Sequence, residues 1–212
     1  MAKIYIARHA ESLANTQGIY QGQTYDTGLS KLGKKQAKAL ACRFKNQIID
    51  RVVVSPLKRT METAQGVAKL YGLKVVEERR IIETNHGKWE GNKKELIAKL
   101  WSETYKVWLT KPSKARFPGG ETFLQTKTRV IRWWKEEAIA YGGTTLVVTH
   151  DNTARIIIAQ VLGLGLDTIW RFQLHPAATT LIEIVDNKAN LVCLNDMSHL
   201  ANLQADIANH AI

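Results

Sequence analysis

The chain has 212 residues, of which 45% are hydrophobic and 23% are charged. These values are ordinary for a soluble globular protein and exclude a disordered chain, so we expect a single α/β domain over residues 1–212. No stretch approaches the roughly 20 apolar residues that a membrane-spanning helix needs. The short apolar run at the N-terminus is too brief for a signal peptide. We therefore expect a cytoplasmic protein with no membrane partner.

The chain is basic, with 30 lysines and arginines against 19 acidic residues and a net charge of +11. Such a balance favours an anionic partner, which is either a nucleic acid or a phosphorylated small molecule. The basic clusters lie far apart along the chain, at residues 34–35, 79–80, 93–94 and 111–116. We interpret most of them as solvated surface and expect no nucleic-acid partner.

The first seventy residues predict strand, helix, strand and helix. The runs 4–7 and 52–54 are apolar, β-rich and continuous rather than alternating, which is typical of strands covered on both faces. The amphipathic stretch 31–45 predicts the first helix. Pro56 stands at the start of the second helical pattern, 57–70, where proline fits a first turn.

The middle of the chain continues the alternation. A short strand is expected at 73–76, and a tryptophan-rich helical region at 93–109. The segment 118–120, Pro-Gly-Gly, breaks the chain before a long helix expected at 121–141. The apolar run 145–148 predicts a further buried strand.

The last part of the chain predicts one helix and a hairpin. Asp151 is expected to cap a helix at 153–162. Strands are expected at 179–185 and 191–194, joined by a turn at 186–188. Because strands alternate with helices along the whole chain, we predict an α/β three-layer sandwich, with a mostly parallel central sheet and helices on both faces.

Residues suited to phosphate chemistry follow three of the expected strands. Arg8 and His9 come after the first strand, Arg59 comes after the second, and His150 comes after the run 145–148. Ligands of open α/β sheets bind outside the carboxyl ends of the strands, where these side chains would meet. Arginine binds phosphate oxygens with two parallel hydrogen bonds, and histidine is a nucleophile or proton carrier near neutral pH. Each residue alone has an ordinary alternative, a loop histidine or a surface cation, but the combination favours an anion-binding site.

Five short motifs occur in order along the chain and include these residues. They are Ala7-Arg8-His9-Ala10-Glu11-Ser12 followed by Asn15, Ser55-Pro56-Leu57 followed by Arg59-Thr60 and Glu62-Thr63-Ala64, Glu83 followed by Gly87 and Trp89-Glu90-Gly91, Pro118-Gly119-Gly120-Glu121, and Val148-Thr149-His150.

In order and spacing these motifs resemble those of the histidine phosphatase superfamily, whose members include the phosphoglycerate mutases. The resemblance implies a phosphoglycerate mutase-like fold and a phosphatase that needs no metal or other cofactor. His9 would be the nucleophile that forms a phosphohistidine, and Arg8, Arg59 and His150 would surround the phosphoryl oxygens. Glu83 would be the general acid; its alternative is a surface salt bridge with a neighbouring arginine.

The resemblance also implies a set of substrate-binding residues. Asn15, Gln21 and Asn152 would donate hydrogen bonds near the phosphate, although each also suits a turn. His86 would meet the non-phosphate half of the substrate, or else lie on the surface. Two further acidic residues, Glu11 and Glu90, are expected to be structural partners of arginines.

Two positions depart from the family pattern: Ala10 stands where glycine is commoner, and Asp151 where the mutases tend to have glycine. We expect Ala10 to be harmless and Asp151 to alter which substrates fit, because it adds a carboxylate beside the phosphate. The motif around Glu83 is similar to that of the metal-independent phosphoserine phosphatases. Sugar phosphates, phosphoglycerate derivatives and α-ribazole phosphate remain alternatives.

Two other activities stay open from the sequence. A phosphoglycerate mutase-type phosphotransferase would use the same site, although 91–111 lacks the Arg-His-Tyr-Gly segment usual in those mutases. A non-catalytic protein that binds a phosphorylated ligand is disfavoured because His9 is present. The family makes a homodimer plausible, with an edge supplied by the hairpin 179–194.

The remaining unusual residues are interpreted as structural. Cys42 and Cys193 have no second ligand at zinc spacing, and two reduced thiols are favoured over one disulfide. Five tryptophans at helical spacings are expected to pack in the core or a lid rather than to stack on bases. They are Trp101, Trp108, Trp133, Trp134 and Trp170.

Overall fold

The structure is a computed structural model that describes residues 2–207 and 210, and its centre is a six-stranded sheet with the strand order β3-β2-β4-β1-β5-β6. β3, β2, β4 and β1 pair in parallel, whereas β5 and β6 are antiparallel and form one edge. The strands are β1 (Ala2–Arg8), β2 (Arg51–Val54), β3 (Val75–Glu77), β4 (Thr144–Thr149), β5 (Thr179–Val185) and β6 (Lys188–Asp196).

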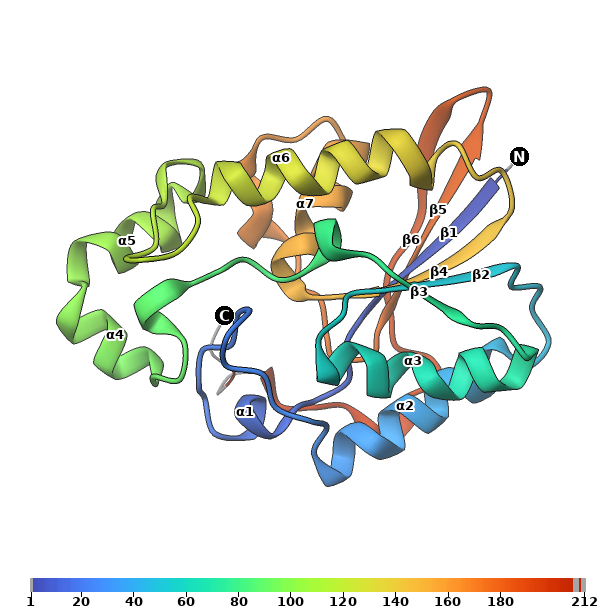
Figure 1. The fold of residues 1–212 in the computed structure, drawn as a ribbon, viewed down its shortest axis with the longest axis horizontal. Coiled ribbons are helices and arrows are strands. Elements are labelled where there is room, and N and C mark those ends of the chain that lie inside the picture. The colour runs from blue at the N-terminus through green and yellow to red at the C-terminus, as the bar shows by residue number, and fades with distance from the viewer. Residues whose placement is uncertain (1, 208–209, 211–212) are drawn as a thin grey trace.

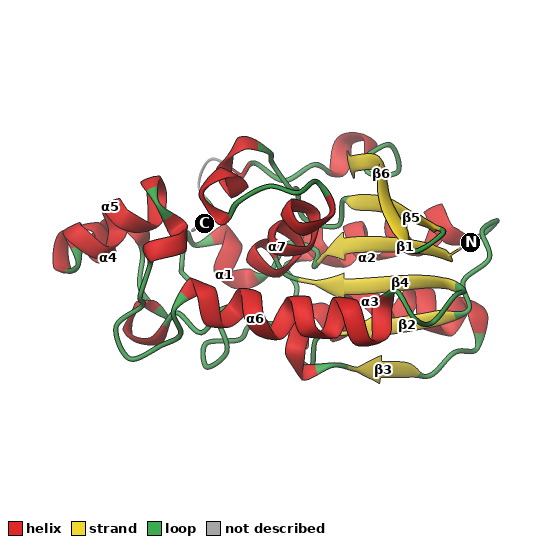
Figure 2. Ribbon diagram, turned by 90° about the horizontal axis from the view of Figure 1, so that it is seen from above, coloured by secondary structure: helices red, strands yellow, loops and turns green. Residues whose placement is uncertain are grey.

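Helices cover both faces of the sheet, as expected, with α2 and α3 on one face and α6 and α7 on the other (Figures 1 and 2). α4 and α5 lie beyond the carboxyl ends of the parallel strands (Figure 2). The α-helices are α1 (Leu13–Thr16), α2 (Lys31–Phe44), α3 (Lys58–Tyr71), α4 (Lys94–Leu100), α5 (Ser102–Thr110), α6 (Phe123–Trp133) and α7 (Asp151–Val161). Short 3₁₀ turns occur at Arg79–Ile81, Gly87–Trp89, Pro112–Lys114, Leu166–Arg171 and Ala201–Leu203, and a π turn at Trp134–Ala138.

The continuous apolar strands are explained by burial on both faces. In β1, Ile4 and Ile6 belong to the hydrophobic cluster on the side of α6 and α7, whereas Tyr5 and Ala7 belong to the cluster with residues of α2 and α3. Successive strand side chains point to opposite faces, so a strand with helices on both sides has to be apolar at every position. β4 follows the same rule, with Val147 on one side and Val148 on the other.

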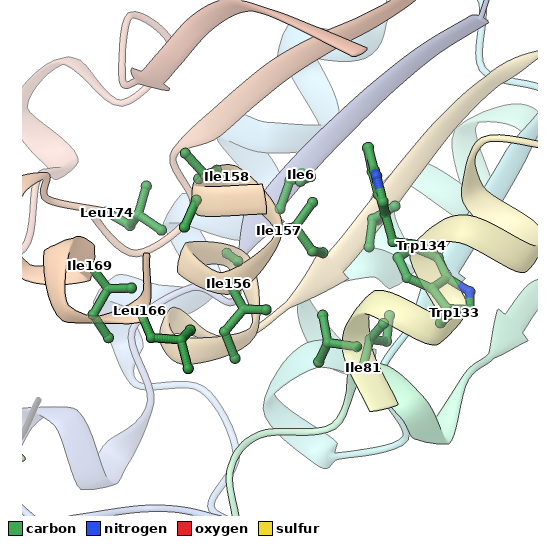
Figure 3. Close-up of a cluster of buried hydrophobic side chains, with 14 of the residues drawn as sticks. Ile6, Ile81, Trp133, Trp134, Ile156, Ile157, Ile158, Leu166, Ile169 and Leu174 are labelled. Carbon is green, nitrogen blue, oxygen red and sulfur yellow. The ribbon is translucent and has the colours of Figure 1, made fainter. Parts of the chain in front are cut away.

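α7 is buried almost all round and fixes the first turn that follows β4. Its residues Ile156, Ile157 and Ile158 are each 1% exposed or less, and Figure 3 shows them among Ile81 and Trp133. Burying side chains of this size stabilises a fold by roughly 1.5–3 kcal/mol each. The start of α7 is therefore held rigidly at the end of β4.

The structure corrects several details of the expected elements. Asp151 is the first residue of α7 rather than its cap; His150 occupies the cap position and makes no side-chain capping bond. The helix expected from residue 121 is α6, which begins after Thr122, whose side chain caps it by accepting from the Gln125 amide. This helix then widens into the π turn Trp134–Ala138.

Two other boundaries differ from the sequence expectation. The tryptophan-rich region forms two helices, α4 and α5, because Trp101 breaks the helical backbone between them with φ of −132° and ψ of 47°. The third strand of the chain is β3, two residues later than expected. Tryptophans pack in the core as expected, with Trp108, Trp133 and Trp134 at most 2% exposed.

The structure also describes the two cysteines and bears on membrane and metal binding. Cys42 and Cys193 are free cysteines and exposed. In the described residues no helix is long and apolar enough to cross a membrane. Residues 2–207 and 210 also contain no group of three or more histidine, cysteine, aspartate or glutamate side chains placed to hold a metal ion.

Candidate active site

A polar pocket lies at the carboxyl ends of β1 and β4, which are neighbours in the sheet. The chain leaves β1 toward one face and β4 toward the other, and such a switch point is the usual ligand site of open α/β sheets. The pocket is narrow, with a cavity volume of about 30 Å³, because polar side chains fill most of it. Its lining residues are Arg8, His9, Asn15, Tyr20, Gln21, Arg59, Glu83, His86, Asp151 and Asn152.

His9 lies directly after β1, is 4% exposed and has one ring nitrogen fixed. Its Nδ1–H donates to the carbonyl oxygen of Ala10 at 2.8 Å. Burial, with Arg59 and Arg8 nearby, holds the pKa of His9 well below its usual range. The imidazole is therefore neutral, and Nε2 carries the lone pair that a nucleophile needs.

Arg8 and Arg59 bring two guanidinium groups to the pocket from distant parts of the chain. Arg8 ends β1 and donates through Nη1 to the Leu174 carbonyl at 2.6 Å. Arg59 lies in the first turn of α3 and donates to Asp26 Oδ1 at 2.7 Å and to the Gly22 carbonyl at 3.1 Å. The Nε atoms of both arginines are buried and have no hydrogen-bond partner in the part of the chain that the structure describes. Two buried cations held in this way favour binding of a dianion.

His150 lies next to His9, as the sequence predicted, at the carboxyl end of β4. The two ring centroids are 5.4 Å apart. His150 is fully buried, is absent from the pocket lining, and its Nε2 shares a 2.7 Å hydrogen bond with Ser55 Oγ. Burial and the neighbouring Arg59 hold its pKa well below the usual value, so this ring is also neutral.

Glu83 is the acidic group of the pocket whose pKa lies near neutrality. It is 6% exposed, and its Oε1 accepts a hydrogen bond from the Thr84 amide at 2.8 Å. Burial raises the pKa of Glu83 to about 7, so the carboxyl group can both donate and accept a proton at neutral pH. The alternative of a surface salt bridge is wrong, because Arg80 pairs with Glu78 and Glu136 instead.

The motifs around Gly87 and Gly120 hold the Glu83 loop by direct backbone packing. A Cβ atom on Gly87, which has φ of +57°, would lie 2.2 Å from the Pro118 carbonyl oxygen, and one on Gly120 would lie 2.3 Å from the Asn85 carbonyl oxygen. Only glycine allows this approach. Arg129 adds hydrogen bonds to the carbonyls of Ile82 at 2.6 Å and Glu83 at 2.9 Å.

The expected neutral hydrogen-bonding residues also line the pocket. Asn15 completes the capping box of α1 with Ser12, so it serves a turn as well. Gln21 donates through Nε2 to Ser12 Oγ at 2.8 Å. His86 is 3% exposed rather than on the surface, and its Nδ1–H donates to the Gln21 carbonyl at 2.8 Å. Burial lowers the pKa of His86 to about 4, so Nε2 accepts from the Asn152 amide group at 3.3 Å.

Comparison with known proteins decides the family. The model of the histidine phosphatase superfamily (branch 1) matches residues 4–197. The chain belongs to the histidine phosphatase superfamily. It is 35% identical over 207 residues to phosphoserine phosphatase 1 of Hydrogenobacter thermophilus, covering 97% of this chain and 98% of that protein. It is thus an enzyme, a phosphatase of small phosphorylated substrates that works through histidine.

Solved structures of related proteins have the same fold as this histidine phosphatase. YhfR of Bacillus stearothermophilus superposes with a TM-score of 0.89 at 23% identity, covering 94% of this chain and 100% of that chain. Phosphoserine phosphatase of Entamoeba histolytica, solved in complex with 3-phosphoglyceric acid, gives a TM-score of 0.83 at 25% identity, again covering 94% and 100%.

Asp26, which no sequence motif singled out, orients Arg59 and also accepts from the Lys58 amide at 2.6 Å to begin α3. Asp26 lies in an irregular polar loop, where spacing carries no information about its partner.

We expected Glu11 and Glu90 to be partners of arginines, and this expectation is wrong. Glu11 accepts from Ser30 Oγ at 2.5 Å, and Glu90 accepts from backbone amides such as that of Thr24 at 2.6 Å.

Proposed function

We propose that this histidine phosphatase hydrolyses its substrate through a phosphohistidine on His9. The observation that carries the proposal is the state of His9: a neutral imidazole, fixed through Nδ1, lining one pocket with Arg8 and Arg59. In the first step Nε2 attacks phosphorus and the bond to the ester oxygen breaks. Glu83 gives its proton to the leaving alkoxide.

The second step returns the enzyme to its starting state. The Glu83 carboxylate takes a proton from water as the water oxygen attacks phosphorus, and the bond to His9 breaks. Arg8 and Arg59 hold the equatorial oxygens through both steps, with His150 beside them. Fixed positive charges in a buried site stabilise such charge without reorganisation, and one well-placed donor is worth about 3–4 kcal/mol of barrier.

For the substrate we propose a small phosphorylated metabolite, with O-phosphoserine as the first choice. The high coverage by the Hydrogenobacter thermophilus phosphoserine phosphatase supports this choice. In this proposal Asn15, Gln21 and Asn152 contact the phosphate, and His86 faces the remainder of the substrate. Glycerate and sugar phosphates are the competing substrates, and phosphoryl return to a second hydroxyl would make the enzyme a mutase.

The proposal extends to organisation and location. We propose one domain over residues 1–212, a cytoplasmic enzyme, and a homodimer. β6 supports the dimer because it is an edge strand with exposed apolar side chains, Val192 at 53% and Leu194 at 37%. Unpaired edge strands favour pairing with another chain.

The test is hydrolysis of p-nitrophenyl phosphate and O-phosphoserine by the wild-type protein, by His9→Ala and by His199→Ala, each with and without EDTA. His199 is a half-buried histidine outside the pocket and serves as the matched control. We expect His9→Ala to lose at least about 10³-fold in kcat, as removal of a nucleophile does, and His199→Ala to keep its rate. Rapid acid-free quenching with ³²P-labelled substrate should label the wild-type protein and His199→Ala but not His9→Ala. Wild-type-like turnover by His9→Ala would contradict the mechanism.

A further inference from the structure

Asp151 is the second carboxyl group of the pocket, and the mechanism does not use it. It begins α7 and is 6% exposed. Its Oδ2 accepts from Arg155 Nε at 2.6 Å. Its Oδ1 lies 3.3 Å from Arg8 Nη1 and is buried without a hydrogen-bond partner among the described residues. Asp151 lines the pocket, and its Oδ1 pairs with Arg8 by charge but receives no hydrogen bond from the described residues.

Asp151 stays charged in conditions where Glu83 does not. Arg155 and Arg8 hold the pKa of Asp151 below its usual value although burial acts in the other direction. The pKa of Glu83 is about 7. The pocket thus keeps a negative charge at Asp151, beside Arg8, and this charge attracts a cationic group of a substrate.

Arg155 does not offer its charge to the pocket, because its guanidinium is committed elsewhere. Its Nη1 donates to the Ile169 carbonyl at 2.6 Å and also to the Phe172 carbonyl. The group lies over the Trp170 ring at 5.1 Å. Arg155 is also absent from the pocket lining, so it fixes the rotamer of Asp151 from behind while the carboxylate remains part of the wall.

We propose that the Asp151 carboxylate receives a positively charged amino group of the substrate. The residue then selects phosphate monoesters of amino alcohols and hydroxy amino acids over equivalent esters without an amine. This inference rests on the proposed function, since it concerns a second part of the same substrate.

The phosphate and the ammonium group of such a substrate lie close together, as Arg8 and Asp151 do in the pocket wall. In O-phosphoserine the amino nitrogen is separated from the ester oxygen by only two carbon atoms, so the ammonium group lies close to the phosphate. Arg8 and Asp151 are neighbours in the same way. With the phosphate on Arg8 and the ammonium on Asp151, negative and positive groups alternate. The ammonium then donates a charge-assisted hydrogen bond to the Asp151 carboxylate.

The test compares kcat/KM for O-phosphoserine with kcat/KM for the ester in which hydrogen replaces the amino group, 3-phosphooxypropionate. We expect the wild-type enzyme to prefer the amine-bearing ester by roughly 10- to 100-fold, the usual range for a hydrogen bond to a charged group. In Asp151→Asn the preference should fall to within about 3-fold. The ratio is the readout, because any shift of Arg8 changes both rates together and cancels.

Two outcomes would overturn the inference, and a third would contradict the proposed function. A wild-type ratio near one overturns the inference without any variant. An unchanged ratio in Asp151→Asn, with both rates lowered equally, means that Asp151 only positions Arg8, and also overturns it. No hydrolysis of either ester or of p-nitrophenyl phosphate by the wild-type protein would instead contradict the proposed function.

Discussion

The chemistry of single residues in this enzyme is set by burial more than by residue type. His9 and His150 are neutral because the charged form is poorly solvated beside two arginines. Glu83 has the opposite shift for the same reason, since burial penalises its carboxylate. The sequence named these residues through a family resemblance, but the protonation state of each depends on what surrounds it in space.

Glu83→Gln tests the general acid at the residue scale. We expect kcat/KM for O-phosphoserine, whose alkoxide needs a proton, to fall by roughly 10²- to 10⁴-fold. The fall in kcat/KM for p-nitrophenyl phosphate should be much smaller. Because the pKa of Glu83 is about 7, its proton-bearing form is present below pH 7 and lost above it. The wild-type kcat/KM for O-phosphoserine, which is set by the first step, should therefore fall as pH rises through 7. Equal losses for both esters would show that Glu83 is not the acid.

Among the elements, the loop from Glu83 to Gly91 depends on close backbone packing against the segment at Pro118–Gly120. Both segments were prominent in the sequence, but their glycines gave no sign of touching. The structure shows why the glycines occur in both segments. A Cβ atom on Gly87 or Gly120 would collide with the backbone of the other segment. The loop is also held by Arg129 through three carbonyl groups, those of Arg80, Ile82 and Glu83.

Gly87→Ala tests this contact, with Gly163→Ala as the matched control. Both glycines have positive φ, +57° and +66°, but a Cβ on Gly163 meets nothing within 4 Å. The control should lose about 1 kcal/mol from backbone strain alone and keep its activity. Gly87→Ala should lose more stability, by roughly 2–4 kcal/mol, and activity as well, because the Glu83 loop must move. Thermal unfolding and steady-state kinetics measure both effects; equal behaviour of the two variants would contradict the contact.

At the scale of the whole molecule, β6 is one of the two edge strands of the sheet. β6 pairs only with β5 among the described strands, and its sequence is short of the charges that usually protect an edge. Figure 2 shows β5 and β6 at the side of the sheet opposite β3. This edge lies away from the pocket residues of α3 and is available to a second copy.

Val192→Lys tests the proposed dimer. Sedimentation velocity of the wild-type protein should give about twice the chain mass of 23.9 kDa. A lysine on each edge strand places like charges across the interface and should shift the mass toward one chain. The matched control is Val76→Lys on β3, the opposite edge strand, where the side chain is 41% exposed. A wild-type monomer, or a dimer that Val76→Lys dissociates and Val192→Lys does not, would contradict the proposal.

Local sequence determined much of this protein. Continuous apolar runs identified the buried strands β1, β2 and β4, because a strand covered on both faces has no polar position to spare. An amphipathic stretch identified α2, and helical patterns identified α3 and α7. The motif order identified the family, and with it Arg8, His9, Arg59, Glu83 and His150 as a group.

Tertiary structure alone decided how those residues meet. The orientation of Arg59 depends on Asp26, the neutrality of His9 on its burial beside arginines, and the orientation of His150 on its bond to Ser55. Such contacts join residues far apart in the chain, so no local pattern encodes them. Periodicity records which side of an element is buried, whereas charge and protonation depend on the neighbours that folding brings together.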